Sequence, residues 1–181
     1  MNTRVVLTML LVGLALLFAG CTTPGGPQSP HSTENATLFN AISAINAELS
    51  NIRDQNLAST QILAGTGITG SGAELALQQK LDNLPWALSS VTISPEGIIV
   101  AAIPEHYHHI VGRDVNYQGP VQEALSMKVP RVSEVFMMEE GFTGISQSAP
   151  VFAKDGSYLG YTDVTYRPET LIARAVDPII D

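Results

Sequence analysis

The sequence predicts an α+β domain in which a long amino-terminal helix packs on a five-stranded antiparallel sheet. Apolar residues recur at helical spacing between residues 33 and 63, and the chain beyond Pro85 contains short segments rich in β-branched and aromatic residues. Turns with proline or glycine join these segments as hairpins. Helices that precede a run of hairpins favour an α+β domain over an alternating α/β domain. A chain of 181 residues is long enough for one such domain with a single core.

The amino terminus has the layout of a secretory signal. Arg4 precedes an apolar run over residues 5–18, and two small residues stand directly before Cys21, the only cysteine. The apolar run has 14 residues, fewer than the ~20 that a membrane-spanning helix needs, which favours a cleaved signal over a retained anchor. We therefore expect residues 1–20 to be a lipoprotein signal peptide.

The segment Leu17–Cys21 resembles the lipobox of prokaryotic lipoproteins, although Phe18 stands where an aliphatic residue is commoner. A lone cysteine cannot form an internal disulfide, and lipidation accounts for an odd thiol in an oxidising exterior. We expect lipidation at Cys21 and an extracytoplasmic protein anchored to the cell membrane. An uncleaved anchor with an unmodified cysteine is the alternative, and it also gives membrane attachment.

The charge of the chain argues against nucleic acid as a partner. Cleavage after residue 20 removes one basic residue, Arg4, and leaves 8 basic against 17 acidic residues, a net charge of −9.

The helical part of the domain follows a flexible tether, predicted at residues 21–32 from its proline, glycine and small polar residues. The domain itself is expected over residues 33–181. A helix is predicted over residues 33–63, since its apolar residues follow a heptad spacing: Leu38, Ile42, Ile45, Leu49 and Ile52. This seam either packs on its own domain or forms a homodimer with a second copy.

The remaining elements follow from local pattern and turn chemistry. A second amphipathic helix is predicted over residues 73–84, and a short helix over 120–127. Strands are predicted over residues 90–93, 98–103, 131–138, 143–153 and 158–166.

The order and spacing of five short motifs over residues 88–171 resemble Cache domains, the extracytoplasmic PAS-like sensors of prokaryotic chemoreceptors and histidine kinases. The motifs are Ile93–Ile98, Gly112–Val115, a short helix with Val121 and Ala124, Gly144–Pro150, and Asp155–Gly160. The long helix before the sheet fits the same pattern.

The resemblance implies a PAS-like sheet whose concave face, closed by the short helix and its flanking loops, holds a small extracellular molecule without catalysis. The arginine-tryptophan-tyrosine signature of amino-acid-binding double Cache domains is missing. A single sensor unit on a lipid anchor would require a membrane signalling partner.

Three histidines crowd the segment Glu105–His109. His106 and His108 would face one side of an extended segment, which makes zinc binding an alternative. No further Cys or His completes a typical ligand set outside the tether, so a structural or solvent-exposed loop is favoured and no metal ligand is assigned. Ligand contact or pH sensing by these residues also stays open.

No enzymatic activity and no cofactor are predicted. The chain lacks a Gly-x-Ser-x-Gly elbow and the glycine patterns of nucleotide-binding loops. Glu139 and Glu140 are adjacent beside Gly141 and are expected in a solvated turn, since adjacent residues do not supply the opposed geometry of glycosidase acids.

Strand alternation predicts part of a ligand pocket. Tyr161, Asp163 and Thr165 share one face of their strand, and Ser133 shares a face with Val135 and Met137. A carboxylate in a central strand needs a partner when buried, so Asp163 either faces solvent or meets a cation such as Arg113 or a ligand amine. By the resemblance, Asp163 occupies a ligand-contacting position in the last strand.

The other candidate ligand-binding residues lie in segments that the resemblance places around the pocket: Tyr107, Arg113, Asp114, Tyr117 and Ser146. Arg113 and Asp114 could equally form an ion pair that fixes their loop.

These observations predict a lipid-anchored small-molecule sensor whose ligand is a carboxylate, an amine or an amino acid. A structural or interaction lipoprotein with a self-filled pocket and a metal-binding lipoprotein that uses the histidine segment are the alternatives.

Overall fold

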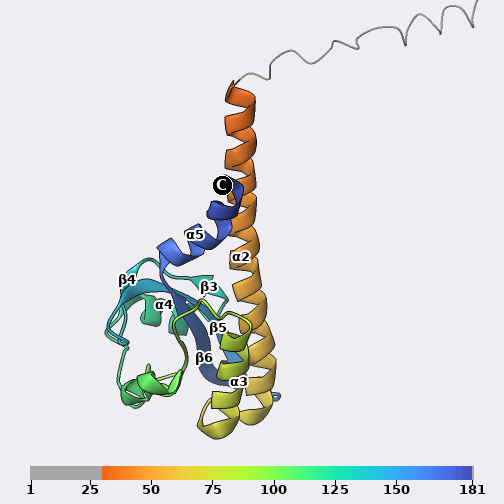
Figure 1. Cartoon of the computed structure of the whole chain (residues 1–181). Helices are drawn as coiled ribbons and strands as arrows, with labels where there is room; N and C mark the ends of the chain where they lie inside the picture. The colour runs from red at the N-terminus through yellow and green to blue at the C-terminus, as the bar shows by residue number, and fades with distance from the viewer. Residues whose placement is uncertain (1–29, 181) are drawn as a thin grey trace, which may run out of the picture. The chain divides into compact units, whose positions relative to one another are not determined.

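The fold is an antiparallel sheet between two sets of helices, in a computed structural model that describes residues 30–180 (Figure 1). Its helices are α2 (Pro30–Thr66), α3 (Gly70–Asp82), α4 (Gly119–Met127) and α5 (Pro168–Ile180), with a 3₁₀ helix η1 (Glu105–Ile110). Its strands are β1 (Ser90–Ile93), β2 (Ile99–Ile103), β3 (Arg131–Val132), β4 (Phe136–Met137), β5 (Thr143–Phe152) and β6 (Tyr158–Tyr166). The predicted α+β class, with its long amino-terminal helix, is confirmed.

The sheet has the strand order β2-β1-β6-β5-β3, and β4 also pairs with β5. All of the pairings are antiparallel. Both predicted hairpins are present, and hydrogen bonds within each turn stabilise them. Gly97, with φ of +84°, donates its N–H to the Ser94 carbonyl (2.9 Å), and Asp155 accepts the Ser157 N–H (2.9 Å).

Helix α2 begins at Pro30, inside the segment predicted as a tether, and ends where Gly67 adopts a positive φ. The carboxyl-terminal part of its heptad seam packs within the domain: Ile52 is buried in a cluster with Val164 and Tyr166, which Ile45 and Leu49 border. The other part is exposed, since Leu38 and Ile42 are 61% and 50% exposed.

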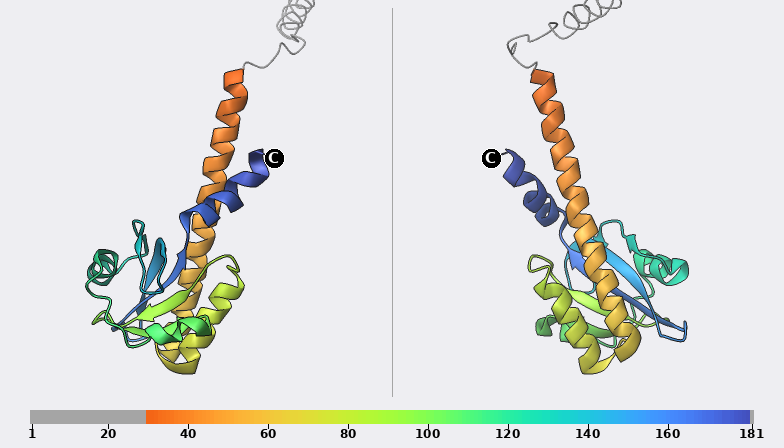
Figure 2. Two further views of the ribbon diagram at one scale, coloured as in Figure 1. Left: turned by 60° about the vertical axis from the view of Figure 1, so that its left-hand side comes forward. Right: turned by 90° about the vertical axis from the view of Figure 1, so that its right-hand side faces the viewer.

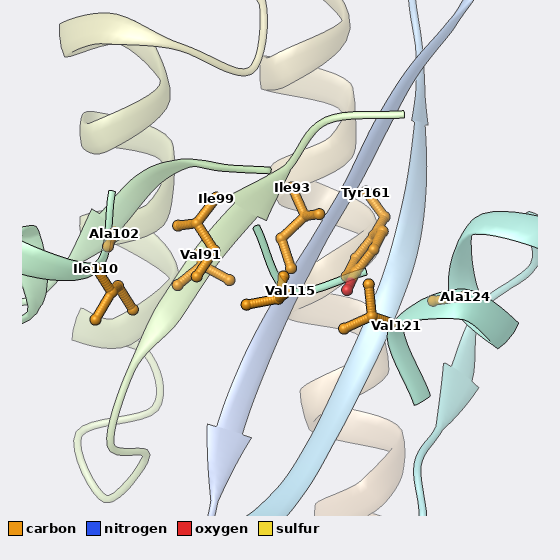
Figure 3. Packing of buried hydrophobic residues seen from close by; sticks show 9 residues of the cluster. All are labelled: Val91, Ile93, Ile99, Ala102, Ile110, Val115, Val121, Ala124 and Tyr161. Carbon is orange, nitrogen blue, oxygen red and sulfur yellow. The ribbon is translucent and has the colours of Figure 1, made fainter. Parts of the chain in front are cut away.

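The helices α2 and α3 cover one face of the sheet, and η1, α4 and their loops lie over the other face (Figure 2). Leu63, Ala76 and Leu77 of the two long helices pack on Ala101 and Val151 of the sheet. On the opposite face, a second cluster joins strands β1, β2 and β6 to η1 and α4, and Figure 3 labels its residues.

Two predicted segments differ in the structure. The strand expected over residues 131–138 is split into β3 and β4, so the expected face of Ser133, Val135 and Met137 does not continue through it. The histidine segment is the 3₁₀ helix η1 and is not extended, so His106 and His108 do not alternate as in a strand. Residues 168–180, for which the sequence pattern predicts no element, form α5.

The predicted signal peptide, Cys21 and the tether before residue 30 lie outside the described residues. Within residues 30–180, no helix combines the length and the apolar character required to cross a bilayer.

Candidate ligand-binding pocket

A pocket lies on the face of the sheet opposite α2 and α3, and its empty space is about 470 Å³, which includes open solvent. Apolar side chains of the cluster in Figure 3 line one part of it, including Ile93, Val121 and Tyr161. Polar side chains line the other part: Gln118, Arg131, Ser133, Glu139, Glu140, Ser146, Ser148, Asp163 and Thr165. An apolar wall with a few converging polar groups is typical of small-molecule sites.

Strand alternation places Tyr161, Asp163 and Thr165 on the pocket wall, as the sequence predicted. Asp163 is only 4% exposed. Its Oδ2 accepts a hydrogen bond from Ser146 Oγ (2.7 Å) and its Oδ1 accepts one from the Val91 N–H (3.3 Å). Burial, with a contribution from the nearby Glu140 charge, raises the pKa of Asp163 to about 6. Asp163 therefore neither faces open solvent nor pairs with Arg113.

Glu140 is the second carboxylate of the pocket, and it is not the solvated turn residue that the sequence suggested. Ser89 Oγ donates a hydrogen bond to Glu140 Oε1 (2.5 Å), and the same hydroxyl lies 2.5 Å from Thr165 Oγ1. Burial raises the pKa of Glu140, with a smaller contribution from Glu139. Two carboxyl groups with raised pKa values thus face one small pocket.

Glu139 is the third carboxylate, and its side chain is only 17% exposed, which also corrects the expected solvated turn. Arg113 Nη1 lies 3.2 Å from Glu139 Oε1, and Tyr117 Oη donates a hydrogen bond to Oε2 (2.9 Å). Arg113 and Tyr117 come from the connection between η1 and α4, so Glu139 fastens this connection to the turn before β5.

Arg131 is the cationic side chain among the described pocket residues, and sequence reasoning missed it. Its guanidinium forms an ion pair with Glu123 of α4 and donates a hydrogen bond to the Pro120 carbonyl (3.4 Å). Its charge is therefore largely compensated by Glu123, as that of Glu139 is by Arg113, and Asp163 and Glu140 are the pocket carboxyl groups without a direct ion pair among the described residues.

The structure brings together four of the eight predicted ligand-binding residues: Ser133, Ser146, Tyr161 and Asp163 line the pocket. Arg113 and Tyr117 reach its rim through Glu139, whereas the other two predicted residues lie outside the lining. Tyr107 packs against the apolar cluster, and Asp114 accepts the Asn116 N–H (2.9 Å) within its own loop instead of pairing with Arg113.

The sequence profile of HK/GC/chemotaxis protein-like sensor domains matches residues 47–168. The chain belongs to this sensor family. The match spans the carboxyl-terminal part of α2, the whole sheet and the pocket, and it confirms the resemblance to Cache domains. A search of curated proteins found no match.

Solved structures of Cache-type sensors share this fold. An extracellular ligand binding receptor from Desulfohalobium retbaense aligns with a TM-score of 0.73 and 28% identity, over 77% of this chain and 26% of that chain. The ligand-binding domain of the Campylobacter jejuni chemoreceptor Tlp3, in complex with 4-methylisoleucine, aligns with a TM-score of 0.66 and 16% identity, over 77% and 59%. The ligand-binding domain of the Pseudomonas aeruginosa amino acid chemoreceptor PctC, in complex with GABA, aligns with a TM-score of 0.60 and 22% identity, over 78% and 67%.

The chain thus spans about a quarter of the first of these structures and about three fifths of the second.

The histidine segment of this Cache domain lies beside the pocket and does not line it. The 3₁₀ helix brings His109 back toward His106, and His109 Nδ1 lies 2.8 Å from the His106 carbonyl oxygen. Within residues 30–180, no group of three or more His, Cys, Asp or Glu side chains is arranged to hold a metal ion.

Proposed function

We propose that this Cache domain is an extracytoplasmic, non-enzymatic sensor whose pocket binds a small metabolite through an ammonium group. The observation that carries the proposal is Asp163, a buried carboxylate that faces the pocket without an ion-pair partner among the described residues. A buried carboxylate is costly unless it is paired, and a ligand ammonium would form a direct ion pair with it from the pocket side. Glu140 adds a second negative charge to the same wall.

The charge balance of the pocket favours an amine or an amino acid over a simple carboxylate ligand. Glu139 is paired with Arg113 and Arg131 with Glu123, which leaves Asp163 and Glu140 as the pocket carboxyl groups without a direct ion pair in the described part of the chain. An amino acid would place its ammonium at Asp163 and its carboxylate toward Arg131. The compounds named with the Tlp3 and PctC structures, 4-methylisoleucine and GABA, also carry both groups.

The proposal includes attachment to the membrane through lipidated Cys21 and transmission of the ligand state to a membrane partner. The lipobox-like segment supports the attachment. Labelled palmitate should be incorporated into the chain expressed in a bacterial host, and Cys21→Ser should abolish the incorporation. Incorporation that persists in the variant would disprove lipidation at this residue.

Thermal unfolding of the full chain in mild detergent tests ligand binding. The compounds would be GABA, L-isoleucine, L-serine, putrescine, acetate and Zn²⁺. A ligand at 100 times its Kd stabilises the folded state by about 2.7 kcal/mol, which raises the Tm by roughly 5 to 10 °C for a domain of this size. We expect an amine or amino acid to give this shift and acetate to give none.

The variant Asp163→Asn should lose the shift, because the neutral amide cannot pair with an ammonium. Asp54→Asn is the matched control, since Asp54 lies exposed on α2. A shift that survives in Asp163→Asn would contradict the proposed site. A response to Zn²⁺ alone would favour the metal-binding alternative, and no response at all would favour an interaction protein with a self-filled pocket.

A further inference from the structure

Lys80 of α3 is a buried lysine on the helical side of the sheet, directly behind the pocket. It is 2% exposed, and its ammonium donates three hydrogen bonds. The acceptors are Asn56 Oδ1 of α2 (3.0 Å), Thr162 Oγ1 (2.6 Å) and the main-chain oxygen of Asp163 (3.0 Å). Lys80 thus holds the residue of β6 whose side chain lines the pocket on the opposite face.

Neither Asp163 nor Lys80 forms a direct ion pair with another side chain among the described residues. The two hydrogen bonds to Asp163 come from a neutral hydroxyl and a main-chain N–H. All three hydrogen bonds from Lys80 go to neutral oxygens. The Lys80 ammonium touches the main chain of Asp163, so two opposite charges are buried on the two sides of one strand residue. They attract each other, because little water lies between them to screen the attraction.

The other charged groups near Asp163 do not provide the compensation. Glu140, from the turn between β4 and β5, is itself acidic and disfavours a second negative charge. Arg131 of β3 is held by Glu123, and Tyr161 on β6 is a neutral phenol, since burial keeps its pKa well above the usual value.

We propose that Lys80 is the fixed counter-charge of Asp163, and that it keeps the ligand-facing carboxylate ionised and in place from the opposite face of the sheet. A counter-charge inside the pocket would occupy the position of the ligand. A counter-charge behind the sheet leaves that position free for an ammonium group. Lys80 is therefore a positioning residue for the proposed amine site, and this role rests on the function proposed above.

The titration of the two groups agrees with this arrangement. Burial lowers the pKa of Lys80 to about 7, and the charge of Asp163 opposes this decrease. At the pKa of Asp163, about 6, Lys80 is mostly protonated. Burial and Glu140 raise the pKa of Asp163, and the Ser146 hydrogen bond and the Lys80 charge lower it, so removing the lysine charge would raise this pKa further.

The test is a ¹³C NMR titration of the Asp163 carboxyl group in the full chain, assigned with Asp163→Asn. In Lys80→Met the titration midpoint should rise by at least about one pH unit, a tenfold change in proton affinity, whereas Lys80→Arg should retain most of the wild-type value. A midpoint that Lys80→Met leaves unchanged would overturn the proposal.

A purely structural role is separated by Asn56→Leu. This variant removes a neutral member of the same network, which also donates a hydrogen bond to the Gln147 carbonyl (2.7 Å), and it keeps the charge. Its effect on the Asp163 midpoint should be much smaller than that of Lys80→Met. Equal effects of the two variants would assign Lys80 a packing role and overturn the proposal.

If Lys80→Met does not fold, the same coupling is measured from the other side. Coupling between two sites is reciprocal, so Asp163→Asn should lower the ¹⁵N titration midpoint of the Lys80 ammonium by a similar amount. An unchanged lysine midpoint in a folded Asp163→Asn protein would equally overturn the proposal.

Binding of GABA and L-isoleucine separates this inference from the proposed function. If either compound binds and Lys80→Met raises the carboxyl midpoint from about 6 to about 7, its affinity should fall about tenfold at pH 5 but only about twofold at pH 7, and recover as the pH rises through the new midpoint. Binding that persists with no change in the midpoint overturns the role of Lys80 alone. A shifted midpoint in a protein that binds no amine overturns the proposed function alone.

Discussion

Adjacent residues of β6 make contacts on opposite faces of the sheet. Thr162 accepts a hydrogen bond from Lys80 on the helical side and donates one to the Val91 carbonyl (3.0 Å), while the Asp163 side chain enters the pocket. Two consecutive residues of β6 therefore connect the helical layer, through Thr162, with the candidate site, through Asp163.

The pKa values of Asp163 and Lys80 predict a pH-dependent stability with opposite slopes. The folded-state pKa of Asp163, about 6, lies above its unfolded value, so its contribution to the free energy of unfolding falls as the pH rises from about 4 to about 6. The folded-state pKa of Lys80, about 7, lies below its unfolded value, so its contribution rises from about pH 7 to about pH 10. The change is on the order of 3 kcal/mol for Asp163 and about 5 kcal/mol for Lys80.

Urea unfolding between pH 4 and pH 10 tests this prediction in the wild type, Asp163→Asn and Lys80→Met. The difference in the free energy of unfolding between wild type and Asp163→Asn should account for the decrease between about pH 4 and pH 6. The difference in the free energy of unfolding between wild type and Lys80→Met should account for the increase between about pH 7 and pH 10. Stability curves that run parallel for all three proteins would show that neither group titrates abnormally.

At the scale of an element, strand β6 depends on a close contact at Gly160. Gly160 has φ of +126°, and a Cβ atom there would lie 2.0 Å from the Ile93 carbonyl oxygen of β1. Gly156, in the turn before β6, has φ of +86° but no atom within 4 Å of such a Cβ. The two glycines therefore share an unfavourable backbone conformation for other residues but differ in available space.

We expect Gly160→Ala to lower the free energy of unfolding by at least about 3 kcal/mol, and Gly156→Ala by about 1–2 kcal/mol. The difference between the variants measures the contact between β1 and β6. Chemical denaturation at one pH gives both values, and equal losses would mean that β1 can move away from β6 at little cost.

Elements that depend on nearby residues in the sequence could be predicted. Elements that depend on pairing with distant residues could not. The two hairpins and the helices α2, α3 and α4 follow from turn chemistry and periodicity. The break between β3 and β4 and the placement of β1 beside β6 depend on pairings with residues far along the chain.

The pocket divides in the same way. Alternation along β6 predicted its three pocket residues, whereas the burial of Glu139 and Glu140 comes from Arg113, Tyr117 and Ser89, which lie more than twenty residues away in sequence. A signal for Lys80 was present, since it continues a helical stripe of buried residues in α3, Ala73, Ala76 and Leu77. A single lysine in such a stripe is usually exposed at a helix edge.

At the scale of the whole molecule, the exposed part of the α2 seam predicts self-association. Leu38 and Ile42 of the seam are 61% and 50% exposed, and Phe39 beside them is 69% exposed. Each large apolar side chain withdrawn from water contributes about 1.5–3 kcal/mol. We therefore expect a dimer through this part of α2, and the double variant Leu38→Glu/Ile42→Glu to weaken association by at least about a hundredfold.

Sedimentation equilibrium of the full chain in density-matched detergent measures this association. Asn46→Glu is the matched control, because Asn46 is an exposed polar residue of the same helix. A monomeric wild type, or a control that dissociates as strongly as the double variant, would contradict a dimer through the seam.

The strand that carries Asp163 continues almost directly into the last helix. Strand β6 ends at Tyr166 and α5 begins at Pro168, so Arg167 is the whole connection. Asp163 lies three residues before the strand end, a distance of about 10 Å at the usual rise of a strand. Arg174 of α5 in turn lies near Glu48 of α2 (3.6 Å). No flexible loop separates β6 from α5. A small displacement of β6 at the pocket would therefore be transmitted to α5 and change its position relative to α2.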